Sequence, residues 1–425
     1  MSDNIQPEGV TPESPVENGN AAEVTGGGQT NGGGKKVSAG VFIVSLLMVI
    51  VLTGALCFAA FTAVLARERE SLGFLRKVQQ LDSIYRQYYV GDLDYDAITD
   101  SLLRAYISSI DKYGYYLDAR DYHQMVSELN STTTGMGVYV TDAGYGLEIV
   151  HVMANSPAKA AGLQTGDVVY RVNGVLYTDV GYSRFLELSR GVEGNTGTVE
   201  IMRGEESLTF EITYAKYYIE TVFPKVLANG VGYILIVSFD EGTASDFKAA
   251  VDELKKAGCD RFVFDLRGNG GGRIDTVTNM LDYVMGEGLI TTITDSEGNV
   301  VESYYSDAKD AIEGMPCVLL VNSMTASASE LFACALRDSK GALLVGVTTY
   351  GKGTMQHILS MADGTGVGIT TNFFNPPKTP NFDGVGLTPD VVAYQSDEGL
   401  YYSIFTIPYE YDTQLQAAVA AVTGK

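Results

Sequence analysis

The chain has 425 residues and a formal net charge of −23 at pH 7. This length exceeds that of one ordinary domain and predicts two or three domains, each with its own core. Such an acidic chain is not expected to bind nucleic acid, because phosphate contacts require clustered Lys and Arg. The composition therefore predicts a multidomain protein without a nucleic-acid partner.

The N-terminal region divides into a polar part and an apolar part. Residues 1–36 have few large apolar side chains, so we expect a disordered tail. Residues 40–66 carry no charge and are longer than the apolar region of about 7 to 15 residues in a secretory signal, which predicts an uncleaved transmembrane helix. Cys57 leaves a lipoprotein open as an alternative, although Leu56 is large for a lipoprotein cleavage site. The flanking charges do not orient this helix.

The four cysteines do not form a metal-binding pattern. They are Cys57, Cys259, Cys317 and Cys334, with no CxxC pair and no Cys/His ligand spacing. Cys317 and Cys334 lie in apolar segments, where a buried thiol behaves as a small hydrophobic side chain. We therefore expect no metal and no cofactor.

Two segments after the apolar stretch differ in their periodicity. Residues 68–131 repeat apolar side chains every three or four positions, which predicts helices, with Asp94 or Asp96 as an N-cap. Residues 133–215 alternate short strands with Gly-rich turns, which predicts a small β-rich module.

This module resembles a PDZ domain. The resemblance rests on "GMGV" and on "SPAKAAGLQTGDVVYRVNG", residues 156–174. It implies that a loop of Gly135, Met136, Gly137 and Val138 binds a peptide carboxylate through backbone N–H groups, while the peptide adds a strand to the sheet. The alternative is that the two glycines only permit a tight turn.

Residues 217–395 alternate strands with helices. Repeated units such as "CDRFVFDL" followed by "IDTVTNMLDYVMG" predict an α/β fold with a mainly parallel sheet. Ligands bind such sheets outside the carboxyl ends of the strands. We therefore expect the loops at 268–273 and 323–327 to share one functional face.

Few side chains in this region can act as a general base. His357 is its one histidine, so a Ser-His-Asp arrangement would have to use it. Lys352, between two glycines, is the other candidate, and it can accept a proton only if burial lowers its pKa from about 10.4. The alternative for "GKG" is a solvated turn.

The block "MTASASELFACALRDSKGALLVGVTTYGKGTMQ" resembles the active site of the C-terminal processing peptidases, also called tail-specific proteases. "FVFDLRGNGGG" and "GVGLTPDVV" extend the resemblance. It implies that Ser327 is the nucleophile, that Lys352 is its base and that Gln356 supports the lysine. It also implies a core related to the crotonase and ClpP folds over residues 217–395, with 396–425 packed on it.

The oxyanion of such a reaction needs backbone donors near the nucleophile. Ser327 is expected to begin a helix, so the N–H of Ala328 is one candidate. The glycine loop supplies a second N–H, with Gly271 favoured over Gly272. The other hydroxyl residues of the block are interpreted as capping or packing groups: Ser323, Thr325 and Ser329.

Two positions depart from the family pattern. The D-P-Y-S of the family is "DKYG" here, and Gly270 stands where the family has a proline before the glycine pair. These changes affect loop geometry and leave the serine and lysine in place. His357, beside Gln356, keeps a competing imidazole open.

The expected function is a membrane-anchored serine endopeptidase that recognises protein C-terminal tails through its PDZ domain. The resemblance implies a single-pass protein of the cell membrane, with residues 40–66 in the bilayer, 1–36 in the cytoplasm and the catalytic domain outside it. Substrates are proteins or peptides with accessible C-termini, and a homo-oligomer or an adaptor protein stays open. The alternatives are a catalytically silent PDZ scaffold and an acyl-CoA enzyme on the related fold.

Overall fold

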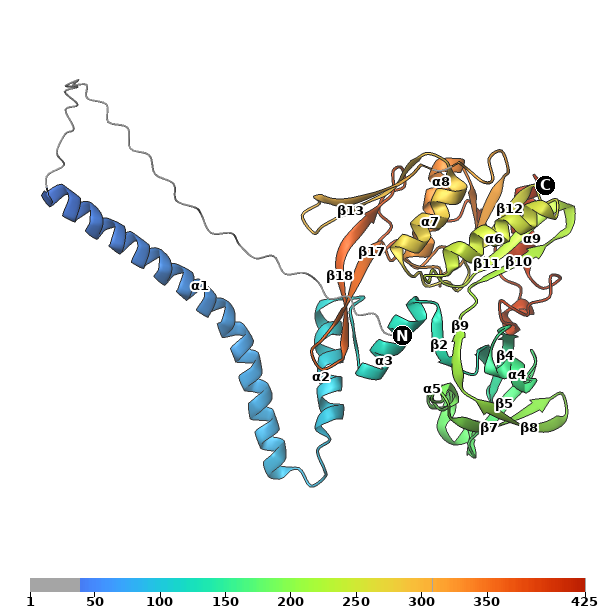
Figure 1. Ribbon diagram of the computed structural model, residues 1–425, viewed down its shortest axis with the longest axis horizontal. Coiled ribbons are helices and arrows are strands. Elements are labelled where there is room, and N and C mark those ends of the chain that lie inside the picture. The colour runs from blue at the N-terminus through green and yellow to red at the C-terminus, as the bar shows by residue number, and fades with distance from the viewer. Residues whose placement is uncertain (1–38, 308, 425) are drawn as a thin grey trace, which may run out of the picture. The chain divides into compact units, whose positions relative to one another are not determined.

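The computed structural model describes residues 39–307 and 309–424, with side chains described for only part of 39–71 (Figure 1). The chain divides into two units, residues 1–93 and 94–425. The first unit contains one long helix, α1 (Ala39–Tyr88). The tail predicted at residues 1–36 lies outside the described residues.

The predicted transmembrane helix, residues 40–66, falls within α1. Most of its side chains are outside the described set. Among the residues that the structure describes, no helix combines the length and the apolar character needed to cross a membrane.

The predicted helical segment, residues 68–131, begins within α1 and continues into the second unit. It contains α2 (Tyr95–Ile110), a short strand β1 (Tyr115–Leu117) and α3 (Ala119–Leu129). Of the two predicted caps, Asp94 is the one that begins α2, because its carboxylate accepts the Ala97 N–H at 3.0 Å. The chain then turns into β2 (Thr132–Gly135).

The β-rich module is a five-stranded antiparallel path in the order β3-β4-β5-β7-β8, with β6 paired to β5. One edge of this sheet is β3, and the start of β7 alternates exposed and buried side chains as expected for a half-solvated sheet. Strand β9 (Ala215–Tyr218) leaves the module and pairs with β2. The module consists of β3 (Val138–Asp142), β4 (Leu147–Val152), α4 (Pro157–Ala161), β5 (Val168–Val172), β6 (Val175–Leu176), α5 (Tyr177–Arg190), β7 (Thr196–Arg203) and β8 (Glu206–Thr213).

The core of the second unit is a six-stranded sheet in the order β10-β11-β12-β15-β16-β19. Every neighbouring pair from β11 to β19 is parallel and β10 is antiparallel, so the prediction of a mainly parallel sheet is confirmed. The elements are β10 (Val222–Val226), η1 (Ala228–Gly230), β11 (Val231–Ile236), α6 (Thr243–Lys256), β12 (Arg261–Asp265), α7 (Ile274–Met285), β15 (Cys317–Val321), α8 (Ala328–Lys340), β16 (Leu343–Gly346), β19 (Val391–Val392), η2 (Gly399–Tyr401) and α9 (Thr413–Thr423).

Helices cover both faces of this sheet (Figure 1). Phe262 and Phe264 of β12 pack in the cluster that also contains α6, α7 and α8, whereas Val263 between them packs in the cluster that contains α9. This alternation follows from the two-residue period of a strand. Cys317 and Cys334 are buried in the first cluster, as predicted.

A second, antiparallel sheet stands beside the core. Its strand order is β1-β18-β13-β14, with β17 paired to β18. Strand β1 comes from the N-terminal segment, β13 and β14 follow α7, and β17 and β18 come after α8. The remaining bounds are β13 (Gly288–Thr294), β14 (Val300–Ser306), β17 (Thr354–Ser360) and β18 (Gly366–Asn375). This pairing brings residues near 113 close to residues near 356.

A buried ion pair ties the end of β12 to the C-terminal segment. The guanidinium of Arg267 donates to Asp265 at 2.7 Å and to both carboxylate oxygens of Asp412 at 2.7 and 2.8 Å. All three side chains are almost completely buried. Because a buried ion pair is tolerated only when its hydrogen bonds are satisfied, this arrangement fixes the loop that follows β12.

Candidate active site

The loops after β12 and β15 meet at the carboxyl end of the sheet. The Ala326 N–H donates to the carbonyl of Asn269 at 3.0 Å. A Cβ built on Gly271 would lie 2.9 Å from Cβ of Ser327 and 3.1 Å from the Ala328 nitrogen, so no larger residue fits at Gly271. The two loops therefore share one face, as the strand order predicts.

Ser327 occupies a strained backbone position at the start of α8. It has φ 59° and ψ −121°, a region that residues other than glycine rarely adopt. Such strain persists only where the surrounding structure enforces it, and it is concentrated at functional sites. Its side chain is half-buried and lies where unpaired backbone N–H groups of a helix favour negative charge.

Glu330, one turn into α8, binds both the serine loop and the lysine loop. Its side chain is fully buried. One carboxylate oxygen accepts the Ser327 N–H at 2.9 Å and the Lys352 N–H at 2.8 Å. The other accepts the Thr349 hydroxyl and the Gly351 N–H. Burial raises the pKa of the Glu330 carboxyl, and these four donors oppose the rise.

The shared oxygen fixes the distance between the two loops. Because both N–H groups bind it, the backbone nitrogens of Ser327 and Lys352 lie no more than about 6 Å apart. A second link is the hydrogen bond from the Tyr350 N–H to the Thr325 carbonyl, at 2.9 Å. The structure thus brings together the serine and the lysine that the sequence singled out.

Lys352 is half-buried and Gln356 contacts it. The lysine Nζ donates to Gln356 Oε1. Burial lowers the pKa of Lys352, and the nearby carboxylate of Asp111 opposes this change. The direction is the one that a lysine base requires, because only the neutral amine accepts a proton.

The side chains of Ser327 and Lys352 are not hydrogen-bonded to each other in this conformation. Among the hydrogen bonds of the described residues, none joins Ser327 Oγ to Lys352 Nζ. Catalytic hydrogen bonds are often absent before substrate binds.

The histidines lie elsewhere. His357 is exposed on the face of β17 opposite Gln356, and its Nδ1 is 2.7 Å from the Thr371 hydroxyl. His151 belongs to the β-rich module, where it pairs with Glu220. Within the described part of the chain, no cluster of His, Cys, Asp and Glu has the arrangement of a metal site.

The glycine loop is arranged differently from the prediction. The Gly271 N–H donates to Asn269 Oδ1 at 2.9 Å, so it is not free to bind an oxyanion here. Neither Ala328 nor Gly272 donates its N–H to an acceptor within the described residues. Ala328 is therefore available as predicted, and Gly272, the less favoured alternative, is the available member of the glycine pair.

Two residues near the site were missed by the sequence reasoning. Glu330 was visible in "SASE", but nothing in the sequence shows that its carboxylate reaches a loop about 20 residues later. Tyr113 comes from the N-terminal segment, and its carbonyl accepts a hydrogen bond from Gln356 Nε2 at 2.7 Å. Only the fold brings these segments together.

The β-rich module has a groove where a PDZ domain binds peptides. A cavity of about 130 Å³ lies between the edge strand β3 and α5. Its walls include all four predicted loop residues, apolar side chains of β3, β4 and α5, and polar or charged side chains of α3, β2, β9 and α5. The lining residues are Gln124, Glu128, Thr133, Thr134, Gly135, Met136, Gly137, Val138, Val140, Leu147, Leu186, Ser189, Arg190 and Tyr217. Gly137 has φ 81°, and a Cβ there would lie 2.1 Å from Ser156 Cβ, so this position requires glycine.

The side chain of Tyr217 lies beside the predicted carboxylate loop, residues 135–138. Burial raises the pKa of Tyr217 to about 12, and a hydrogen bond from the backbone of Gly137 opposes the rise. Tyr217 also lines the cavity. Tyr217 is therefore a half-buried side chain at the wall of the predicted carboxylate loop.

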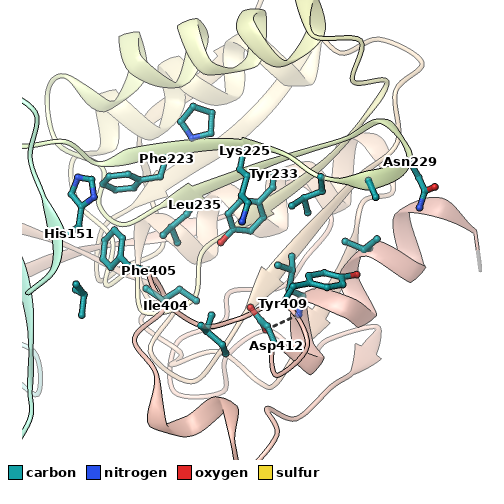
Figure 2. Close-up of a pocket in the computed structure, with 17 residues that line it drawn as sticks. His151, Phe223, Lys225, Asn229, Tyr233, Leu235, Ile404, Phe405, Tyr409 and Asp412 are labelled. Carbon is teal, nitrogen blue, oxygen red and sulfur yellow. Dashed lines mark hydrogen bonds between the residues drawn. The ribbon is translucent and has the colours of Figure 1, made fainter. Parts of the chain in front are cut away.

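A larger cavity of about 430 Å³ lies where this module meets the core (Figure 2). At one end, His151 and Phe405 stack with ring centroids 5.8 Å apart, and Phe223 meets both rings edge-on. His151 Nε2 lies 2.9 Å from Glu220 Oε2. The Tyr139 hydroxyl donates to the Glu220 carbonyl at 2.9 Å. Aromatic packing and the hydrogen bonds of Glu220 to His151 and Tyr139 therefore join the module to the core.

Comparisons with known proteins identify both domains. Residues 230–393 match peptidase family S41, and residues 134–214 match the PDZ domain. The chain is 30% identical over 320 residues to a carboxyl-terminal-processing protease of Picosynechococcus, covering 74% of this chain and 76% of that one. It is 29% identical over 361 residues to carboxy-terminal processing protease CtpA of Bacillus subtilis, covering 84% and 77%.

A solved structure supports the same fold. A putative S41 protease from Bacteroides fragilis superposes with a TM-score of 0.56 at 19% identity, covering 81% of this chain and 97% of that one. At this identity the likeness concerns the fold alone.

The contacts of Glu330 predict the effect of replacing it. A Glu330→Gln variant places an amide NH₂ among four donors, so we expect the free energy of unfolding to fall by about 2 to 3 kcal/mol. We also expect Ser327 to react with a fluorophosphonate roughly tenfold more slowly, or worse, because both loops lose their common acceptor. Urea unfolding and the labelling rate measure the two effects.

The matched control is Glu253→Gln on the exposed side of α6, which leaves both quantities unchanged. Equal behaviour of the two variants would show that Glu330 does not hold the serine and lysine loops together.

Proposed function

Because the chain belongs to peptidase family S41 and to its carboxy-terminal processing proteases, which are serine peptidases, we propose that Ser327 and Lys352 form its catalytic dyad. The observation that carries this proposal is the single Glu330 oxygen that accepts the backbone N–H groups of both residues. The strained Ser327 backbone and the lowered Lys352 pKa support it.

The proposed reaction is acyl transfer to serine. Ser327 Oγ attacks the carbonyl carbon of a peptide bond, and its proton passes to the neutral amine of Lys352. The lysine then gives that proton to the leaving amine. Water attacks the acyl-enzyme with Lys352 again accepting a proton, and the serine hydroxyl is restored. Gln356 holds the lysine through its Oε1.

Backbone donors stabilise the oxyanion in this mechanism. The Ala328 N–H lies directly after the nucleophile, at the start of α8. Gly272 supplies the second N–H in the conformation described, since Gly271 donates to Asn269. Gly271 takes that role only if the Asn269 side chain turns away when substrate binds.

The dyad assignment predicts that cleavage depends on two side chains. The wild-type protein should cleave an unfolded protein that ends in apolar residues. Ser327→Ala and Lys352→Met should each lower kcat/KM by a factor of about 10³ or more, because each removes a group that acts in the transition state. Gel analysis of the products and fluorogenic kinetics measure the loss.

The control is Ser323→Ala, which changes an exposed serine of the same loop and should cleave at the wild-type rate. Cleavage that survives in Ser327→Ala would refute the dyad. If the wild type cleaves nothing while it still binds C-terminal peptides, the alternative of a silent PDZ scaffold gains support.

We propose that the PDZ domain binds the C-terminal tail of the substrate. The groove between β3 and α5 supports this, because Val138 and Leu186 offer an apolar surface and Arg190 a positive charge for a terminal carboxylate.

A negative charge introduced into this groove should weaken the binding of C-terminal tails. Leu186→Asp places a carboxylate beside an apolar peptide side chain, so affinity for peptides with apolar C-termini should fall by roughly tenfold or more. Tyr182→Asp, an exposed position of the same helix, is the control. Fluorescence anisotropy with labelled peptides measures both, and equal affinities would exclude this groove.

We propose that the uncharged residues 40–66 anchor the protein in the cell membrane, with the catalytic domain outside the cytoplasm. Support comes from the length of this stretch and from the lack of any charge in it. Membrane fractionation and externally added protease test the proposal. Recovery of the full-length protein in the soluble fraction would refute it.

A further inference from the structure

Tyr113 contacts the surroundings of the lysine at three points. This residue lies between α2 and β1, in the "DKYG" segment. Its hydroxyl donates to the Gly351 carbonyl at 2.9 Å, its carbonyl accepts Gln356 Nε2 at 2.7 Å, and its ring centroid lies 5.5 Å from Lys352 Nζ. One residue of the N-terminal segment therefore touches the residue before the lysine, the glutamine and the amine itself.

The backbone contact fixes the direction of the Gln356 amide. An amide has one oxygen and one NH₂ group, and here the NH₂ donates to the Tyr113 carbonyl. The amide oxygen is therefore the atom left to accept from Lys352 Nζ. If the Tyr113 carbonyl were displaced, the amide could turn and present its NH₂ group to the amine, where two donors would oppose each other.

The ring contact concerns the charge of the amine. A cation within about 6 Å of an aromatic centroid is attracted by the ring, whereas a neutral amine gains much less. The carboxylate of Asp111, in the same segment, also favours the charged lysine. Burial favours the neutral form. The N-terminal segment thus opposes the effect that makes Lys352 a base.

Other charged groups around the amine belong to several elements. Lys112 Nζ lies 4.6 Å from the same ring centroid, and Asp383 accepts the Tyr113 hydroxyl at 3.1 Å. Glu330 binds the Lys352 backbone from α8. Burial raises the pKa of Tyr113 itself, so its hydroxyl stays protonated throughout the working range.

We propose that Tyr113 is the positioning residue of the base: it orients Gln356 toward Lys352 and sets the pH above which the amine is neutral. The proposal rests on the proposed Ser-Lys function. It means that the residues matched to peptidase family S41, 230–393, do not contain the whole active site, because one supporting residue precedes the PDZ domain.

The pH profile of the full-length protein tests this inference. Tyr113→Leu keeps the backbone carbonyl but removes the ring, so the charged lysine loses a stabilising contact. The acid limb of kcat/KM, and of fluorophosphonate labelling of Ser327, should move to lower pH by about half to one unit. Tyr113→Phe keeps the ring and the carbonyl, so its acid limb should stay in place while its plateau falls roughly threefold to tenfold.

Two further variants complete the experiment. Asp111→Asn removes a charge that favours the ammonium form, so its acid limb should also move to lower pH. If Tyr113→Leu does not fold, Tyr113→Phe decides the matter, and a plateau equal to that of the wild type would overturn the role of Tyr113. Tyr145→Leu, an exposed tyrosine of the PDZ domain, should leave the profile unchanged.

The outcomes separate this inference from the function on which it rests. An active wild type whose acid limb does not move in Tyr113→Leu, or moves to higher pH, would overturn the role of Tyr113 alone. A wild type without activity at any pH would overturn both proposals. A shift shared by Tyr145→Leu would also overturn the inference, since it would not be specific to the site.

Discussion

The buried carboxylate of Glu330 is the interaction on which the site depends. It accepts four hydrogen bonds. The donors are the backbone N–H groups of Ser327, Gly351 and Lys352 and the hydroxyl of Thr349. A buried charge is tolerated only with such complete hydrogen bonding, so the two loops have little freedom to separate. Glu330 therefore holds the backbones of Ser327 and Lys352 close together, and the hydrogen bond from the Tyr350 N–H to the Thr325 carbonyl is the second link between the loops.

The same constraint accounts for the strain at Ser327. Its φ of 59° is unfavourable by itself, but its N–H is held by Glu330 and its side-chain carbon lies against Gly271. Glycine is required at Gly271 because any Cβ would collide with the serine turn. The strained backbone of Ser327, the glycine at 271 and the carboxylate of Glu330 thus belong to one arrangement. It places Ser327 Oγ at the carboxyl end of a parallel sheet.

Much of this arrangement could be predicted from the sequence, and the reasons for the rest are physical. The alternation of strand and helix patterns predicted the parallel sheet, and from that sheet we predicted that the two loops lie on one face. The motif carried Ser327, Lys352 and Gln356. Glu330 could not be assigned, because its partners lie on a loop that only the fold brings near. Gly271 was favoured as a donor because sequence does not show that Asn269 binds its N–H.

The contribution of the N-terminal segment has the same origin. Tyr113 reaches Gln356 because β1 pairs with β18, which is paired with its neighbour in the chain, β17, although β1 lies more than 200 residues before both strands. Local patterns describe each strand, whereas the register between them is a property of the whole sheet. The active site is therefore assembled from segments on both sides of the PDZ domain.

The titration of Lys352 tests the central claim most directly, because a serine-lysine dyad requires a neutral amine near physiological pH. Isotope labelling of lysine, with the Lys352 signal assigned through a Lys352→Met spectrum, gives its protonation midpoint by NMR in the full-length protein. We predict a midpoint below the ordinary value of 10.5, since burial disfavours the charged form. A midpoint at or above 10.5, with or without bound peptide, would contradict the role of Lys352 as the base.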